Sequence, residues 1–153
     1  MEPVSITERE AFAVLGVQTR IDPWQADYHG IWEEQYMPHD EAVSGLANEE
    51  GYYALYWASD EAGKVEFLAG RAVGDVDRVP EGLVLREMPA SLYAVFECPL
   101  ASLHSTWQHI GDVWLPGSAQ YAADESRACF EYFPPGADEG KAPVSVHVAI
   151  KPK

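Results

Sequence analysis

Two stretches of the chain carry large apolar residues at every third or fourth position, the period of an amphipathic helix. The first stretch begins at Asp22-Pro23, a capping side chain followed by a proline suited to the first helical position, and ends at Pro38. The second runs from about 101 to 114. The apolar stripes are Trp24, Tyr28, Ile31, Trp32 and Tyr36 in the first, and Leu100, Leu103, Trp107, Ile110 and Trp114 in the second. The pattern predicts two helices.

Shorter apolar or aromatic runs between turn residues predict strands. The predicted strands cover 11–21, 51–58 and 64–73 before the middle of the chain, and 90–98, 127–133 and 143–151 after it. An acidic stretch at 39–50 is predicted to be a loop with at most one helical turn. Residues 74–88, which contain Pro80, Gly82 and several charges, are predicted to be the connector between the two sets.

The two sets of elements follow the same order about 78 residues apart (15 to 93). The matched segments are Leu15-Gly16-Val17-Gln18 with Tyr93-Ala94-Val95-Phe96, Tyr36-Met37-Pro38 with Trp114-Leu115-Pro116, Tyr53 with Glu131, and Phe67 with Ser145. We interpret the repeat as a duplicated strand–helix–strand–strand unit covering 11–75 and 89–153.

One such unit alone would leave a helix stripe and a sheet edge uncovered. Two units can join into a single antiparallel sheet with both helices on one face, so the sequence predicts one α+β domain over residues 1–153. This arrangement leaves a groove between the helices, where a ligand pocket is expected.

The charge balance narrows the classes of partner. Ten basic residues against 25 acidic ones give a net charge of −15, and no basic stripe appears, so direct binding to nucleic acid is not expected. An acidic surface favours cationic partners or ligands. The absence of a signal-like N-terminus and of an 18-residue apolar run argues against secretion and membrane spanning. Cys98 and Cys129 are interpreted as reduced core residues, and a cytoplasmic location is expected.

Glu131 is the candidate functional residue, because it interrupts an aromatic strand, Ala128-Cys129-Phe130-Glu131-Tyr132-Phe133. Both faces of that strand are apolar or aromatic, so the carboxylate has no evident solvent-facing side. Two interpretations stay open at this point. Glu131 is either an exposed edge-strand residue or a partner of Arg71 or Arg127, or it is a carboxylate held in an aromatic cavity to recognise a cation.

Aromatic residues are plentiful on the elements that would line the groove: Trp24, Trp32, Tyr53, Trp57, Tyr93, Phe96, Trp107 and Trp114. Aromatic faces attract cations and stack on planar ligands. No other chemistry is marked. His104 and His109 are five residues apart and would not share a helix face, no nucleophile motif or phosphate loop occurs, and neither a metal nor a cofactor is expected.

Several short motifs together resemble a known family. They are Gly82-Leu83, Met88-Pro89-Ala90, Tyr93-Ala94-Val95-Phe96, Trp114-Leu115-Pro116-Gly117-Ser118, Phe130-Glu131, Phe67-Leu68-Ala69-Gly70 and Ile31-Trp32. The combination resembles the GyrI-like effector-binding domain, the drug-sensing module of some AraC-type and other multidrug-responsive transcription regulators. The resemblance implies a duplicated strand–helix–strand–strand fold and a stand-alone module, because no DNA-binding helices precede residue 11.

The resemblance also implies site residues. The family's pocket acid falls on Glu131 and its helix-terminal tryptophan on Trp114, while pocket aromatics fall on Tyr53, Tyr93 and Trp32. Phe96 joins this set as an aromatic of the strand beside the groove.

The function favoured at this stage is binding of cationic or amphipathic aromatic compounds, with Glu131 as the counter-charge, for sequestration or for sensing on behalf of a separate regulator protein. Two alternatives follow from the resemblance. One is hydrolysis of strained electrophilic toxins, with Glu131 activating water. The other is a protein-interaction module acting on DNA gyrase, as the GyrI protein does.

Overall fold

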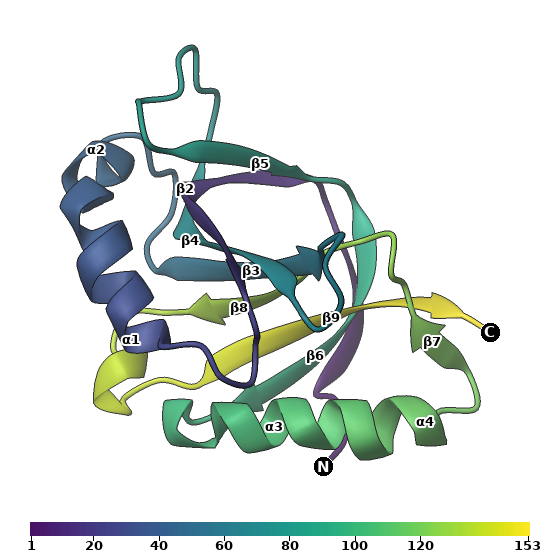
Figure 1. The fold of residues 1–153 in the computed structure, drawn as a ribbon. Coiled ribbons are helices and arrows are strands. Elements are labelled where there is room, and N and C mark those ends of the chain that lie inside the picture. The colour runs from purple at the N-terminus through teal and green to yellow at the C-terminus, as the bar shows by residue number, and fades with distance from the viewer.

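The computed structural model describes residues 1–153 and has nine strands and two helical segments (Figure 1). The strands are β1 (Ser5–Arg9), β2 (Phe12–Ile21), β3 (Tyr52–Ala58), β4 (Val65–Val73), β5 (Val84–Met88), β6 (Ser91–Cys98), β7 (Tyr121–Ala123), β8 (Cys129–Phe133) and β9 (Val144–Pro152). The first helical segment joins α1 (Tyr28–Gly30), a π-helical turn (Ile31–Tyr36), a 3-10 turn (Met37–His39) and α2 (Asp40–Ser44). The second joins a 3-10 turn (Leu100–Ser102), α3 (Leu103–His109), a π-helical turn (Ile110–Trp114) and α4 (Leu115–Gly117). A short 3-10 turn (Ala137–Glu139) precedes β9.

All strand pairs are antiparallel, and the main sheet has the order β1-β6-β9-β8-β3-β4-β2-β5, with β7 beside β9. The sheet is strongly curved (Figure 1). Its central pair is β3 with β8, where Ala54 lies opposite Glu131. The predicted α+β class, one antiparallel sheet with two helices on one face, is confirmed.

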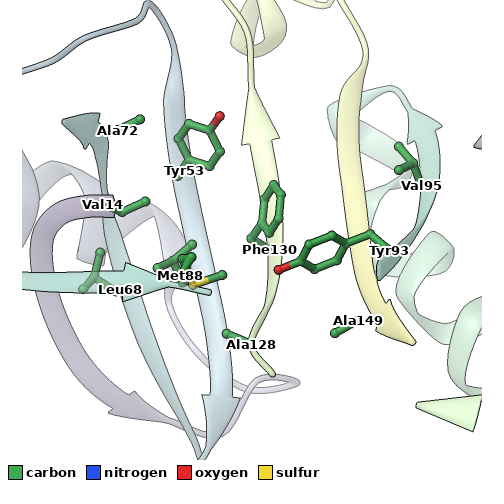
Figure 2. Close-up of a cluster of buried hydrophobic side chains, with 11 residues drawn as sticks. Val14, Tyr53, Leu68, Ala72, Met88, Tyr93, Val95, Ala128, Phe130 and Ala149 are labelled. Carbon is green, nitrogen blue, oxygen red and sulfur yellow. The ribbon is translucent and has the colours of Figure 1, made fainter. Parts of the chain in front are cut away.

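Three buried clusters hold the layers together. Beneath the first helical segment, Ile31 and Tyr36 pack against Phe67 of the sheet, and beneath the second, Ile110 packs against Phe96. The opposite face of the sheet carries a third cluster built on Tyr53, Tyr93, Phe130 and neighbouring aliphatic residues (Figure 2). Both faces of the central strands are therefore buried, which explains their near-continuous apolar sequence.

The order strand, helix, strand, strand occurs twice, as β2 to β4 and as β6 to β9 with β7 inserted. The offset of 78, however, pairs residues on different faces of the sheet, since Leu15 packs beneath the first helical segment and Tyr93 lies in the cluster on the opposite face. Side chains alternate between the faces of a strand, so an offset wrong by one residue changes the face. Tyr53 and Glu131, matched at an offset of 78, consequently lie on opposite faces of the sheet and are not equivalent.

The first helix begins and ends later than predicted. The side chain of Asp22 caps a turn by accepting from Trp24 N at 3.0 Å, and the helical N-cap is Asp27, which accepts from Gly30 N at 3.0 Å. Pro38 does not stop the helical segment. In the wide π-helical turn, Met37 N donates to Trp32 O, five residues earlier, instead of to the residue four positions earlier. The backbone hydrogen bonds have therefore left the α-helical pattern before Pro38, which has no N–H to donate. The second segment does the same before Pro116, with Leu115 N donating to Ile110 O.

Three strands were not predicted. The exposed edge strand β1 pairs with β6 and has no apolar pattern, while β5 pairs with β2 inside the predicted connector 74–88. The short strand β7 follows the second helical segment. None of the helices is long and apolar enough to span a membrane.

Candidate ligand-binding site

A cavity of about 1230 Å³ lies between the two helical segments and the sheet, where the groove was predicted. Its sheet side is formed by alternate residues of the central strands, Tyr52 and Tyr56 from β3 and Cys129, Glu131 and Phe133 from β8. These positions share a face because side chains on a strand alternate with a period of two.

Glu131 is 2% exposed and is one of only two polar or charged side chains in the buried core. One carboxylate oxygen accepts from Trp107 Nε1 of α3 at 2.6 Å, and the other accepts from Tyr56 Oη of β3 at 3.0 Å. A buried carboxylate with a donor on each oxygen is compensated only in part, because its charge has no counter-ion.

The interpretation of Glu131 as an exposed edge residue or as an ion-pair partner is wrong. Strand β8 lies inside the sheet between β9 and β3. The guanidinium of Arg71 donates to Gly51 O, Ser44 Oγ and Glu49 O, and that of Arg127 donates to Ser126 O. None of the four ion pairs in the structure contains Glu131.

Burial raises the pKa of Glu131 from its ordinary value of 4.5 to about 7, against the opposing effect of the hydrogen bonds from Trp107 and Tyr56. The raised pKa leaves both the acid and the carboxylate populated near neutral pH. Burial also raises the pKa of Tyr56 well above 10, and it raises that of Tyr28 to about 12 with help from the charge of Glu131. These two phenols therefore remain neutral donors.

The raised pKa makes a prediction about the ligand-free protein. A carboxyl group with a higher pKa when folded stabilises the fold fully below its unfolded pKa, and this contribution is lost as the pH rises through the folded pKa, here about 7. A shift of this size corresponds to at most about 3 kcal/mol. We expect urea unfolding to show that Glu131→Gln gains stability relative to the wild type between about pH 5 and pH 8.5.

The comparison must be made as a difference between the two proteins, because His147 acts in the opposite sense. Burial, with the nearby charge of Arg9, lowers the pKa of His147 to about 4, so its contribution to stability grows as the pH rises. Subtracting the wild-type free energy of unfolding from that of Glu131→Gln at each pH removes the contribution of His147. A difference that does not change with pH would show that Glu131 titrates normally.

Aromatic rings form the walls around the carboxylate. Trp107 lies edge-on to Tyr56 at 5.8 Å between centroids, and Trp32 lies edge-on to Tyr52 at 5.8 Å and to Phe133 at 6.0 Å. At the rim, Trp24 reaches across from the first half to contact His104 of α3 at 5.1 Å, although its side chain is 51% exposed. The cavity is thus an aromatic chamber with one carboxylate in its floor.

The charged residues that line the cavity are mostly acidic. Besides Glu131 they are Glu33, Glu50, Asp124, Glu125 and Asp138 against Arg71 and Arg127. The lining therefore favours entry of positively charged molecules.

The structure brings together only part of the predicted site. Glu131 and Trp32 line the cavity, whereas Tyr53 and Tyr93 point into the cluster on the opposite face of the sheet (Figure 2). Trp114 packs edge-on against Phe96 at 5.3 Å beneath the second helical segment, and neither residue lines the cavity. The Trp114 indole donates to Glu2 at 3.2 Å.

Tyr56 and Tyr28 line the cavity but were not singled out from the sequence, and Trp107, named among the aromatic residues of the groove elements, was not predicted to contact Glu131. Trp107 was visible as a member of the second apolar stripe. It lies seven residues before Trp114, almost two helical turns, so the two rings share a helix side and differ by about 10 Å along the axis. The stripe alone does not decide which of them meets the carboxylate.

Comparison with known proteins places this architecture in a family. The family described as Cass2, integron-associated effector binding protein, matches residues 5–150. The chain belongs to this family. The predicted resemblance to GyrI-like effector-binding domains is thereby confirmed, and the Cass2 match covers both helical segments and eight of the nine strands in full.

A curated relative of this Cass2 protein is the transcriptional regulator BrlR of Pseudomonas aeruginosa, 33% identical over 91 residues. The match covers 60% of this chain but only 33% of BrlR, so the chain spans about a third of that regulator.

Two solved structures share the fold. One is SAV2435 bound to tetraphenylphosphonium, with a TM-score of 0.77, 18% identity, and coverage of 99% of this chain and 94% of that one. The other is the integron cassette protein VCH_CASS2 from the mobile metagenome of Vibrio cholerae, with a TM-score of 0.66, 17% identity, and coverage of 96% and 95%.

Proposed function

We propose that this Cass2-family protein binds amphipathic aromatic cations in the cavity between its helical segments, with Glu131 as the counter-charge. The observation that carries the proposal is the buried carboxylate of Glu131, held by Trp107 and Tyr56 and without an internal cation. The complex of SAV2435 with a phosphonium cation supports the same class of ligand.

The arrangement favours a cation over a neutral compound for two reasons. Aromatic faces provide contact area and attract positive charge, while the carboxylate recovers Coulombic energy in a place where water screens little. Trp107 and Tyr56 direct their donors at Glu131, and the ligand supplies the missing positive charge. A delocalised organic cation suits the site because it costs less to dehydrate than a compact ammonium ion.

Sequestration or sensing for a separate regulator protein is the proposed role. The sequence similarity to BrlR, a transcriptional regulator, supports a link to regulation. In this role the protein would bind the compound and change which surface it presents to its partner.

The surroundings of Glu131 favour ligand binding without turnover over hydrolysis of an electrophilic toxin. A hydrolase needs a general base and a group that protonates the leaving group. The pKa of Glu131, about 7, suits a base. However, the groups that hydrogen-bond to it, an indole and a phenol, both direct their protons at the carboxylate itself and not into the cavity.

The proposal is tested with two ligands of similar shape, the methyltriphenylphosphonium cation and neutral triphenylphosphine oxide. Calorimetric titration above pH 8, where Glu131 is ionised, is expected to show at least about tenfold tighter binding of the cation, or about 1.4 kcal/mol. Equal affinities, or no binding of either compound, would contradict the proposal. Product analysis of the same mixtures by mass spectrometry is expected to return both compounds unchanged.

A further inference from the structure

On the opposite face of the sheet, three aromatic rings surround the guanidinium of Arg9. The ring centroids of Phe12, Tyr53 and Phe130 form a nearly equilateral triangle, with sides of 5.5, 5.4 and 5.6 Å. The three rings come from β2, β3 and β8, and Figure 2 shows the last two side by side on neighbouring strands. We name this group the Arg9 cage.

The guanidinium carbon of Arg9 lies 4.0 Å from the centroid of Phe12, 5.2 Å from that of Phe130 and 5.6 Å from that of Tyr53. All three distances are within the range in which an aromatic face attracts a cation. One Arg9 nitrogen also donates to Tyr53 Oη at 2.9 Å, and the same hydroxyl donates to Glu49 at 2.5 Å. The donated proton makes the phenol oxygen a better acceptor for the guanidinium.

Arg9 takes part in none of the four ion pairs of the structure, and its only side-chain hydrogen bond is the one to Tyr53. The guanidinium charge of Arg9 is therefore stabilised by the three rings and by one phenol oxygen. Glu49 does not contact Arg9 through a hydrogen bond, but it accepts one from the same phenol. This is the chemistry of sites that bind organic cations. Arg9 and Phe12 are only half-buried, so the cage opens to solvent.

We infer that the Arg9 cage is a binding site for guanidinium-class cations, occupied by the chain's own Arg9 as a tethered ligand. Arg9 is the last residue of the edge strand β1, which pairs only with β6. The contacts of Arg9 with the three rings link that strand to β2, β3 and β8 across the curved face of the sheet. Without the Arg9 side chain, the cage would accept a free alkylguanidinium ion.

The Arg9 cage is separate from the Glu131 cavity, although the two share strands. On β8, Phe130 faces the cage and Glu131 faces the cavity, and on β3, Tyr53 and Tyr56 divide in the same way. The inference does not depend on the proposed function, and the two can fail independently.

Chemical rescue of Arg9→Ala in the full chain tests the inference. The variant is expected to melt about 3–6 °C below the wild type, since cation–π contacts with several rings are lost. Methylguanidinium, at concentrations too low to denature, is expected to regain part of that loss. Its methyl proton resonance should also move upfield in the presence of the variant, because the ions sit over ring faces.

Three controls make the result specific. The wild type, whose cage is filled, measures any binding of methylguanidinium to the Glu131 cavity, and Arg9→Ala should exceed it in both effects. Neutral methylurea should give neither effect with either protein. In Arg9→Ala/Phe12→Leu, where one wall of the cage is missing, the rescue should be lost. Equal responses of wild type and Arg9→Ala to methylguanidinium would overturn the inference, as would the absence of any response.

If Arg9→Ala does not fold, the wild type provides the test. The side-chain methylene protons of Arg9 are then expected to resonate upfield of those of the exposed Arg78, and to return toward ordinary values in Phe12→Leu. Ordinary Arg9 shifts in the wild type would overturn the inference.

Discussion

Replacing Glu131 with glutamine is expected to remove both the preference for cations and its dependence on pH. In the wild type, affinity for methyltriphenylphosphonium should rise with pH through about 7 and then level off, because the ionised carboxylate binds the cation and the protonated acid does not. Bound cation lowers the pKa of Glu131, so the midpoint in the complex should lie below that of the free protein. Losing one side of a buried charge contact costs about 2–5 kcal/mol.

The glutamine variant should bind methyltriphenylphosphonium with the same reduced affinity at every pH. Its affinity for triphenylphosphine oxide should change less. Some change is expected, because the amide has only one acceptor oxygen, whereas the carboxylate accepts from Trp107 with one oxygen and from Tyr56 with the other, so one of these donors loses its partner.

Glu33→Gln is the matched control for the loss of one negative charge, because Glu33 lines the same cavity but is exposed. It should keep the cation preference and the pH profile. Parallel losses for the cation and the neutral compound in Glu131→Gln would mean that Glu131 only shapes the cavity.

The fold could be predicted from the sequence where side-chain patterns are tied to burial. Strands β2, β3, β4, β6, β8 and β9 were predicted within a few residues, since their apolar runs face a core on both sides. Strand β1 was missed because an exposed edge strand is held by backbone hydrogen bonds to β6, which place no demand on residue type. Strand β5 was missed because it is also an edge strand, paired only with β2, and lies in a stretch rich in charged residues.

The site was harder to predict because it depends on register. Glu131 could be recognised as a carboxylate without a polar face, but its surroundings are set by which residues lie opposite it. Ala54, and not Tyr53, lies opposite Glu131 across the strand pair, so the offset of 78 pairs Glu131 with a ring on the other face of the sheet. The two π-helical turns, at Ile31–Tyr36 and Ile110–Trp114, alter the phase of each helical stripe in a way that an ideal period does not reveal.

Gly16→Ala is expected to be among the most destabilising single substitutions that add only a methyl group to this protein. Gly16 of β2 lies directly opposite Gly70 of β4. A Cβ atom on Gly16 would lie 2.0 Å from the carbonyl oxygen of Ala69 and 2.7 Å from Gly70 Cα, and both are backbone atoms that no side-chain rotation can move. Strands β2 and β4 would have to separate, which would disturb the packing of the first helical segment on the sheet and one wall of the cavity.

Overpacking of this kind commonly costs 1–3 kcal/mol, and a backbone clash lies at or above the upper end of that range, so we expect a loss of about 3 kcal/mol and a melting temperature roughly 6–12 °C lower. Gly111→Ala is the matched control, because Gly111 is helical and a Cβ there meets no atom within 4 Å. It should leave stability unchanged or raise it by up to about 1 kcal/mol, since alanine favours helix. Thermal unfolding of the three proteins followed by circular dichroism gives the comparison. A Gly16→Ala protein that melts with the wild type would contradict the close approach of β2 and β4.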